Sequence, residues 1–354
     1  MNQKQKYIEK FQKIKTKNID IIGVCIKEGQ NLTGTELAPD CLRKSGLNLV
    51  LEFLGWKIND LGNINLESQD EGQEVHTKIE NKTNQSQDDK QDLQLKYYTN
   101  MKHSETIGQA CQQLHEKVKQ SSQKSNFPLI LGGDHGIATG TISGMLETYE
   151  NLKVIWIDAH GDINLPETSP SGNYHGMPVA HLLGWFQKKV KGFDWLKFKL
   201  KPENIVFIGL RDLDEEEKDL LNKNKIKCFC MHQIDQFGIG EVMKQAFKYL
   251  KIDEDQNSAL HLSFDIDAVD PSFAPGTGTK SKGGLTYREA HYICRSAAES
   301  GKLVSMELVE VNPNLEEVDH HLLHLHGDDK NIKGSKTVGL AIELIKSALG
   351  YTLL

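Results

Sequence analysis

Short apolar runs that alternate with helix-like stretches constrain the fold of this chain more than any other feature. Six such runs lie at 19–26, 126–133, 152–158, 204–210, 258–267 and 302–309. Between them, apolar residues at helical spacing predict helices that include 107–118, 242–250, 287–298 and 338–349. Strands that alternate with helices and are apolar on both faces form a parallel sheet covered on both sides. We therefore predict one doubly wound α/β domain of three layers, which binds ligands beyond the carboxyl ends of its strands.

Length and charge exclude several other classes of protein. The 354 residues would allow two average domains, but α/β enzymes often place roughly 250 to 350 residues on one sheet. The net charge of −7 comes without a concentrated basic face, so a dominant nucleic-acid surface is excluded. No apolar run approaches the roughly 20 residues that span a bilayer, so no membrane partner is expected.

Two segments depart from the alternating pattern of the single domain, 1–354. Residues 66 to about 100 are rich in Gln, Asn, Asp, Glu and Lys, which predicts a flexible surface insertion. A second irregular stretch, about 316–335, contains His320, His321, His324 and His326. We interpret it as a solvated loop, with an accessory metal site as the alternative.

The N-terminal residues and the cysteines give information on the cellular location of the protein. The first 18 residues are Lys-rich, with apolar residues at helical spacing, and predict a surface helix. They lack an apolar core, arginine and serine, so a secretory signal is excluded and a mitochondrial presequence is not supported. The six cysteines lack metal-ribbon spacing and are interpreted as reduced packing thiols. A cytoplasmic location is therefore expected.

Acidic and imidazole side chains follow three of the predicted strands. They are His135 after the second run, Asp158, His160 and Asp162 after the third, and Asp265 and Asp267 at the end of the fifth. Alternate positions of an extended chain project to one face, so side chains two residues apart should converge. A Gly-Gly turn before His135 would aim that ring into the same crevice.

Such a cluster requires cations. Neighbouring buried carboxylates without counter-charge would cost many kcal/mol in desolvation and repulsion. Two divalent ions would neutralise four of them. Oxygen ligands with two imidazoles and no thiolate suit Mn²⁺ or Mg²⁺, and imidazole favours Mn²⁺, with Co²⁺, Fe²⁺ and Ni²⁺ as rivals. Asp134 and Asp270 are instead expected to cap turns.

Seven motifs give the chain a family resemblance. They are GGDHG at 132–136, DAHGDIN at 158–164, SGNYHG at 171–176, GLRDLDEEE at 209–217, SFDIDAVDPSFAPGTGT at 263–279, GGLTYREA at 283–290 and VEVNP at 309–313. Together they resemble the ureohydrolase family, whose members include arginase and agmatinase. They occur in the family's order and cover nearly the whole chain outside the insertion. One of them alone would be only suggestive.

The resemblance implies a dinuclear manganese site and a reaction. One metal would be bound by His135, Asp158, Asp162 and Asp265, and the second by Asp158, His160, Asp265 and Asp267. A hydroxide between two Mn²⁺ ions, oriented by Asp162, would attack the guanidinium carbon of L-arginine and give L-ornithine and urea. The family also suggests a homo-oligomer, either a trimer or a hexamer.

Residues outside the metal set also take roles from the resemblance. His175 would donate or relay the proton to the leaving nitrogen, and Glu310 would anchor the guanidinium group. The implied substrate-binding residues are Asn164, Ser171, Asn173, Asp214, Glu217, Thr279 and Glu310. Alternatively, Ser171 and Asn173 only shape a turn and Asp214 only caps a helix.

The sequence departs from the family pattern at two positions, and it leaves alternative functions open. Gly136 occupies a position where many members have serine, and Pro170 precedes SGNYHG. Neither removes a ligand or a catalytic group. The rival functions are agmatinase, another guanidino or formimino hydrolase, and a non-catalytic protein that binds arginine.

Overall fold

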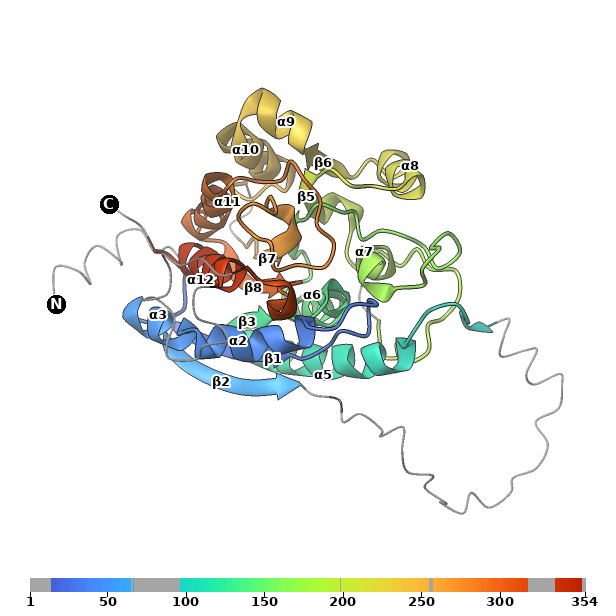
Figure 1. The fold of residues 1–354 in the computed structure, drawn as a ribbon, viewed down its shortest axis with the longest axis horizontal. Helices are drawn as coiled ribbons and strands as arrows, with labels where there is room; N and C mark the ends of the chain where they lie inside the picture. The colour runs from blue at the N-terminus through green and yellow to red at the C-terminus, as the bar shows by residue number, and fades with distance from the viewer. Residues whose placement is uncertain are drawn as a thin grey trace, which may run out of the picture.

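Eight parallel strands form one sheet in the computed structural model (Figure 1), which describes residues 14–64, 66, 96–197, 199–254, 257–317 and 335–351. The strands are β1 Asn18–Val24, β2 Lys57–Ile64, β3 Phe127–Leu131, β4 Lys153–Ile157, β5 Ile205–Leu210, β6 Lys227–Cys230, β7 Leu260–Asp265 and β8 Leu303–Val309. Their order across the sheet is β2-β1-β3-β8-β7-β4-β5-β6, and every pair is parallel. The predicted α/β class is confirmed.

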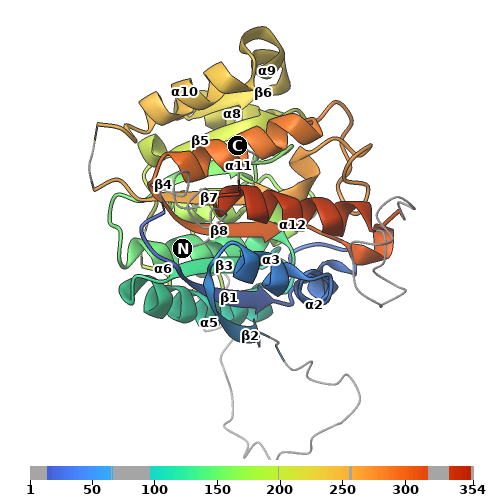
Figure 2. The ribbon, with the colours of Figure 1, turned by 90° about the vertical axis from the view of Figure 1, so that its left-hand side faces the viewer.

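Helices cover both faces of the sheet. One face packs against α2 Ala38–Lys44, α3 Leu47–Phe53, α9 Met231–Phe237, α10 Ile239–Tyr249, α11 Tyr287–Glu299 and α12 Lys336–Ala348. The other packs against α5 Ser104–Gln123, α6 Ala138–Leu146, α7 Pro178–Leu182 and α8 Glu215–Lys223. Strand β1 shows the alternation, because Ile19 and Ile21 enter the first core whereas Ile22 and Val24 enter the second. In Figure 2, α11 and α12 lie side by side in front of the central strands.

The six predicted strands and the four named helices are all present, but β2 and β6 were missed. Both lie at the edges of the sheet and have one neighbouring strand each. Most residues of β2 are exposed or half-buried, and β6 has only four residues. An edge strand therefore lacks the continuous apolar run that makes a central parallel strand recognisable.

The polar segments predicted from composition fall largely outside the described residues. This holds for 67–95, for the histidines within 318–334 and for residues 1–13. The end of the predicted insertion is an exception, since Tyr98 is buried against the folded body, followed by Met101. No disulfide joins any of the six cysteines, all of which are described. Within the described residues, no helix has the length and apolar character needed to cross a membrane.

The strand order explains where the site lies. Strands β3 and β4 are consecutive in the chain but are separated in the sheet by β8 and β7. The crossovers therefore leave a crevice at the carboxyl ends of four adjacent central strands. All six predicted metal ligands, and Glu310, follow or end these four strands.

Candidate metal centre and active site

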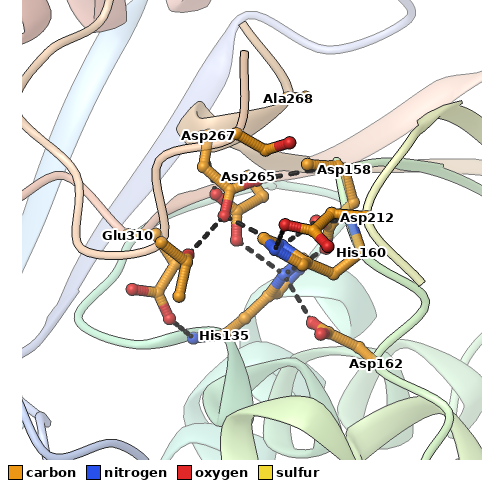
Figure 3. A network of polar contacts seen from close by, with 12 residues as sticks. His135, Asp158, His160, Asp162, Asp212, Asp265, Asp267, Ala268 and Glu310 are labelled. Atoms are coloured by element: carbon orange, nitrogen blue, oxygen red, sulfur yellow. Dashed lines mark hydrogen bonds and ion pairs between the residues drawn. The ribbon is translucent and has the colours of Figure 1, made fainter. Parts of the chain in front are cut away.

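Three carboxylates surround the imidazole of His135 (Figure 3). Its Nδ1 atom lies 3.2 Å from Asp158 Oδ2, 3.1 Å from Asp162 Oδ2 and 3.2 Å from Asp265 Oδ2. The side chains come from the ends of β3, β4 and β7, so the sheet brings together residues that are distant in sequence. This group matches the ligand set expected for the first metal.

A second group lies beside the first and shares one residue with it. The Nδ1 atom of His160 lies 3.1 Å from Asp267 Oδ2 and 3.4 Å from Asp158 Oδ1. Asp158 thus presents one oxygen to each histidine, an arrangement that suits a bridging ligand. The structure brings all six predicted ligands together, while the bridging role of Asp265 stays a prediction.

The ligands converge because the chain turns after each strand. The prediction that they lie on an extended chain was wrong. Strand β4 ends at Ile157, and the Asp158 carboxylate then accepts a 2.7 Å hydrogen bond from the His160 N–H. Likewise, Asp265 Oδ1 accepts a 2.8 Å bond from Asp267 N, at the start of a 3₁₀ turn. Asp162 has φ 49, in the left-handed region that Asp tolerates better than most residues. Aspartate side chains that bond the backbone two residues on bend the chain around the site.

The cluster meets the requirements of a cation site. The buried Nδ1 atom of His135 makes no well-oriented hydrogen bond to any described residue, although carboxylate oxygens lie around it. Burial alone would lower the pKa of His135, yet these carboxylates hold it well above its usual value. Burial, together with Asp267 and Asp158, raises the pKa of Asp265 well above its usual value. A divalent ion would supply the required positive charge to all of these groups at once.

A buried hydrogen-bond chain fixes the tautomer of His135. Ser263 Oγ donates to Glu307 Oε1 at 2.7 Å, and His135 Nε2 lies 2.8 Å from the same Oγ. Glu307 is fully buried beside His261, which lowers the carboxyl pKa against the effect of burial. Because an ionised carboxylate can only accept, Ser263 must donate to it and accept the proton of His135 Nε2. When a divalent ion takes the place of the proton on Nδ1, the lone pair of that atom is directed to the ion.

Replacing Ser263 with alanine should therefore weaken metal binding before it affects the fold. Loss of such a partner of a metal-binding histidine typically costs about 10- to 100-fold in metal affinity. The measurement is the Kd of Mn²⁺ by competition with a chelator. Ser305→Ala is the matched control, because Ser305 Oγ contacts His261 Nδ1 at 2.8 Å, at the far end of the chain. Equal metal affinities in the two variants would contradict the role given to Ser263.

Glu310 and His175 form a pair beside the metal centre. Glu310 Oε1 lies 3.3 Å from His175 Nδ1 and accepts a 2.9 Å hydrogen bond from His135 N. Gln30 Nε2 donates to Glu310 Oε2 at 2.6 Å. Burial alone would lower the pKa of His175, but Glu310 raises it to about 9. Glu310 therefore favours the protonated form of His175, which lines the cavity described below.

The site opens into a cavity of about 340 Å³. The cavity is lined by His160, Asp162, Asn164, Ser169, Pro170, Ser171, Asn173, His175, Gly176, Asp212, Asp214, Glu217, Asp265, Asp267 and Thr279. All predicted substrate-binding residues except Glu310 are among them. Thr279 also donates a 2.6 Å hydrogen bond to Asp267 Oδ2, which ties the cavity wall to the metal centre.

Asp214 caps a helix, as one of the two readings of the sequence expected, and it also lines the cavity, while its contact with substrate stays a prediction. It is the N-cap of α8, where its Oδ1 accepts from Glu217 N at 2.8 Å and its backbone N–H donates to Glu217 Oε2 at 3.2 Å. Its second oxygen accepts a 2.9 Å bond from Asn164 Nδ2, and all three residues line the cavity. Burial and neighbouring Asp162 raise the pKa of Glu217 to about 8.

The turn that carries Ser171 and Asn173 likewise has a local structural role and faces the cavity. Ser171 Oγ accepts from Asn173 N at 3.2 Å, and Ser169 Oγ accepts from Gly172 N at 3.1 Å. The departure at Gly136 has a steric explanation, since a Cβ there would lie 2.8 Å from Asp134 Oδ1 and 2.9 Å from the ring of Tyr174. The neighbouring tyrosine of this chain occupies the space that a serine would need.

The two aspartates assigned to turns are capping residues. Asp134 accepts hydrogen bonds from Gly29 N at 2.8 Å and from Gly136 N at 3.0 Å. Asp270 accepts from Ser272 N at 3.0 Å and from Gly283 N at 2.8 Å. Neither belongs to the two groups described above, as predicted.

Several residues of the site were missed from the sequence. Gln30 lies in an unremarkable loop 280 positions before its partner Glu310. Ser263 and Asp212 lie inside quoted motifs but carry no spacing signal of their own, and Asp212 Oδ2 lies 3.8 Å from His160 Nε2. Trp156 faces the site from within β4, where its Nε1 donates to Asp158 Oδ2 at 2.9 Å. Ser169 also lines the cavity and was missed. Its position two residues before the predicted Ser171 is the one sequence signal that could have indicated it.

Comparisons with known proteins agree with this geometry. The family model described as "Arginase family" matches residues 17–350. An arginase of Plasmodium berghei (strain Anka) is 46% identical over 338 residues, covering 94% of this chain and 93% of that protein. The structure of arginase from Bacillus caldovelox aligns with a TM-score of 0.77 at 38% identity, covering 96% of this chain and 100% of that one. An Entamoeba histolytica arginase solved with L-ornithine aligns with a TM-score of 0.75 at 28% identity, over 96% and 100% of the two chains. The chain therefore belongs to the arginase family.

Proposed function

We propose that this chain hydrolyses L-arginine to L-ornithine and urea with two Mn²⁺ ions. The observation that supports the proposal is the pair of His-Asp groups sharing Asp158, because His160, Asp162 and Asp267 of these groups line the same cavity as His175. Divalent ions bound there would supply Lewis-acid activation of a water molecule at neutral pH. The oxygen-rich ligand set with two imidazoles favours Mn²⁺.

The residues of the chain would orient the substrate and move its proton. Glu310 presents a buried carboxylate next to the metal centre, which suits a planar guanidinium group. Asp162 would hold the attacking water by accepting its hydrogen bond. With Nδ1 of His175 on Glu310, its Nε2 is the atom that would give a proton to the leaving nitrogen of ornithine.

The cavity wall would recognise the amino-acid end of the substrate. Ser171 and Asn173 can donate hydrogen bonds to the α-carboxylate, and the charge of Asp214 can meet the α-ammonium group. Asn164 and Glu217 hold Asp214 in place, and Thr279 also lines the cavity. Agmatine lacks the carboxylate and would leave the donors without a partner.

The comparisons support arginine over the alternatives. The curated relatives from Plasmodium berghei and Bacillus caldovelox are named arginase, and the Entamoeba histolytica arginase was solved with L-ornithine. An agmatinase shares the metal core and differs at the cavity wall. A non-catalytic arginine-binding protein has no need for mutually repelling buried carboxylates beside a protonated histidine.

Urea release from L-arginine and agmatine, measured side by side after Mn²⁺ loading, tests the proposal. We expect kcat/KM for arginine to exceed that for agmatine by up to roughly 10⁴-fold, less if water mediates the contacts at the rim. Equal kcat/KM values for the two substrates would refute the assignment as an arginase, but they would still agree with the wider ureohydrolase reaction. Arginine binding without urea release would indicate the non-catalytic alternative.

Two further proposals follow from the sequence and the family. A cytoplasmic location is supported by six cysteines that form no disulfide. Membership of the family supports a homo-oligomer, either a trimer or a hexamer.

A further inference from the structure

Lys102 is tied to the turn that faces the substrate cavity. Its backbone N–H donates to Gly172 O at 3.0 Å. Its Nζ donates to Asn173 Oδ1 at 3.3 Å and to Asn31 Oδ1 at 3.2 Å. The side chain therefore joins two loops at the cavity rim through two amide oxygens.

The contact with Lys102 decides which way the amide of Asn173 faces. An ammonium group has three donors and no acceptor, so only the oxygen of the amide can point toward it. The NH₂ group of Asn173 must then point away from Lys102. Asn173 lines the cavity, so this orientation presents donors, rather than an acceptor, to a carboxylate inside it.

Lys102 also offsets the charge of the cavity. None of the described residues that line the cavity is a lysine or an arginine. The acidic ones are Asp162, Asp212, Asp214, Glu217, Asp265 and Asp267. Two divalent ions would neutralise the metal ligands, but the carboxylates of Asp212 and Asp214 remain. An incoming α-carboxylate would be favoured by a cation near this wall. Lys102 does not itself line the cavity, but its ammonium group contacts Asn173, which does.

The position of Lys102 is fixed by the segment that precedes it. Tyr98 Oη donates to Glu167, and Asn100 Nδ2 donates to the Pro166 carbonyl. Gly172 has φ 67, and a Cβ there would lie 2.2 Å from Asn100 O. The close approach of the two segments thus requires glycine in the turn. This packing brings Lys102 to the turn irrespective of its own side-chain contacts.

We propose that Lys102 is a specificity-determining residue, which orients Asn173 and attracts the α-carboxylate of an amino-acid substrate. This inference rests on the proposed hydrolysis of arginine. It gives a physical reason for preferring arginine over agmatine that the metal centre does not provide. Because the charge is exposed to solvent, its effect should be moderate and should weaken with salt.

The test compares Lys102→Met with the wild type on L-arginine and agmatine, both loaded with Mn²⁺. We expect about a tenfold rise in KM for arginine with kcat nearly unchanged, and no change in kcat/KM for agmatine. The KM for arginine should rise with ionic strength in the wild type and less in the variant. Lys102→Arg should retain most of the preference, because it keeps the charge and the donors.

Controls separate this role from a structural one. Lys191→Met removes an exposed lysine 3.7 Å from Glu105, on a neighbouring segment, and should leave both substrates unaffected. If Lys102 acts partly through Asn173, its effect should shrink in an Asn173→Ala background. Equal losses for arginine and agmatine, or no change in the KM for arginine, would overturn the proposal.

Binding of the product separates failure of this inference from failure of the proposed function. The Kd of L-ornithine and of putrescine, which lacks the carboxylate, can be measured by calorimetry on the Mn²⁺-loaded protein. Lys102→Met should raise the Kd of ornithine about tenfold and leave the Kd of putrescine unchanged, even if the protein releases no urea. An unaltered Kd of ornithine in a wild type that does hydrolyse arginine would refute only the role of Lys102.

Discussion

Asp158→Asn is expected to abolish turnover and remove bound metal, because Asp158 is the one ligand that presents an oxygen to each histidine. It is fully buried, and its two oxygens lie 3.2 Å from His135 Nδ1 and 3.4 Å from His160 Nδ1. Asparagine has nearly the same shape but removes the negative charge and replaces one oxygen by a donor. We expect kcat/KM for arginine to fall roughly a thousandfold or more.

The metal readouts make this prediction specific. Mass spectrometry should find fewer than two equivalents of Mn²⁺ per chain in Asp158→Asn. The stabilisation of the wild type by Mn²⁺, about 2.7 kcal/mol at 100 times the Kd, should be largely lost in the variant. Asp270→Asn is the matched control, since Asp270 follows β7 but only caps a turn. Near-normal metal content in Asp158→Asn would show that the shared ligand is misassigned.

The sequence predicted the centre of this fold better than its edges, for a physical reason. Central parallel strands are buried on both faces, so most of their residues are apolar and the strands are recognisable without a structure. The edge strand β2 has neighbours on one side only and can be polar along most of its length. Its position depends on pairing with β1, which no local pattern records.

The residues of the site also differ in how far the sequence could predict them. Asp158, His160 and Asp162 stand close together in sequence, so their spacing indicated a ligand group. The turn that joins them was not predicted, because it depends on a side chain that bonds the backbone. Gln30 and Lys102 could not be found from spacing at all. Each meets its partner through the packing of loops that are far apart in the chain.

Glu310→Gln should be the most damaging change outside the metal ligands. Three donors converge on the Glu310 carboxylate: Gln30 Nε2 at 2.6 Å, His135 N at 2.9 Å and His175 Nδ1 at 3.3 Å. Its backbone has φ 62, an uncommon conformation that places the side chain at the end of β8. A glutamine must turn its NH₂ group toward one of these donors, leaving an unpaired buried group and no anion for the guanidinium.

We expect Glu310→Gln to lower kcat/KM for arginine about 10³-fold while both metal ions stay bound, because no predicted ligand is removed. Loss of the anion would also let the pKa of His175 fall from about 9, since Glu310 is what raises it. A proton donor with a lower pKa deprotonates earlier as pH rises, so the alkaline decline of kcat/KM should begin at lower pH than in the wild type.

Glu316→Gln is the control for a lost carboxylate six residues further on. Glu316 accepts from Thr337 N at 3.1 Å at the start of α12, so its replacement should lower Tm without changing kcat. If Glu310→Gln kept near-normal turnover or lost its metal, Glu310 would be a structural residue and the guanidinium anchor would lie elsewhere in the cavity.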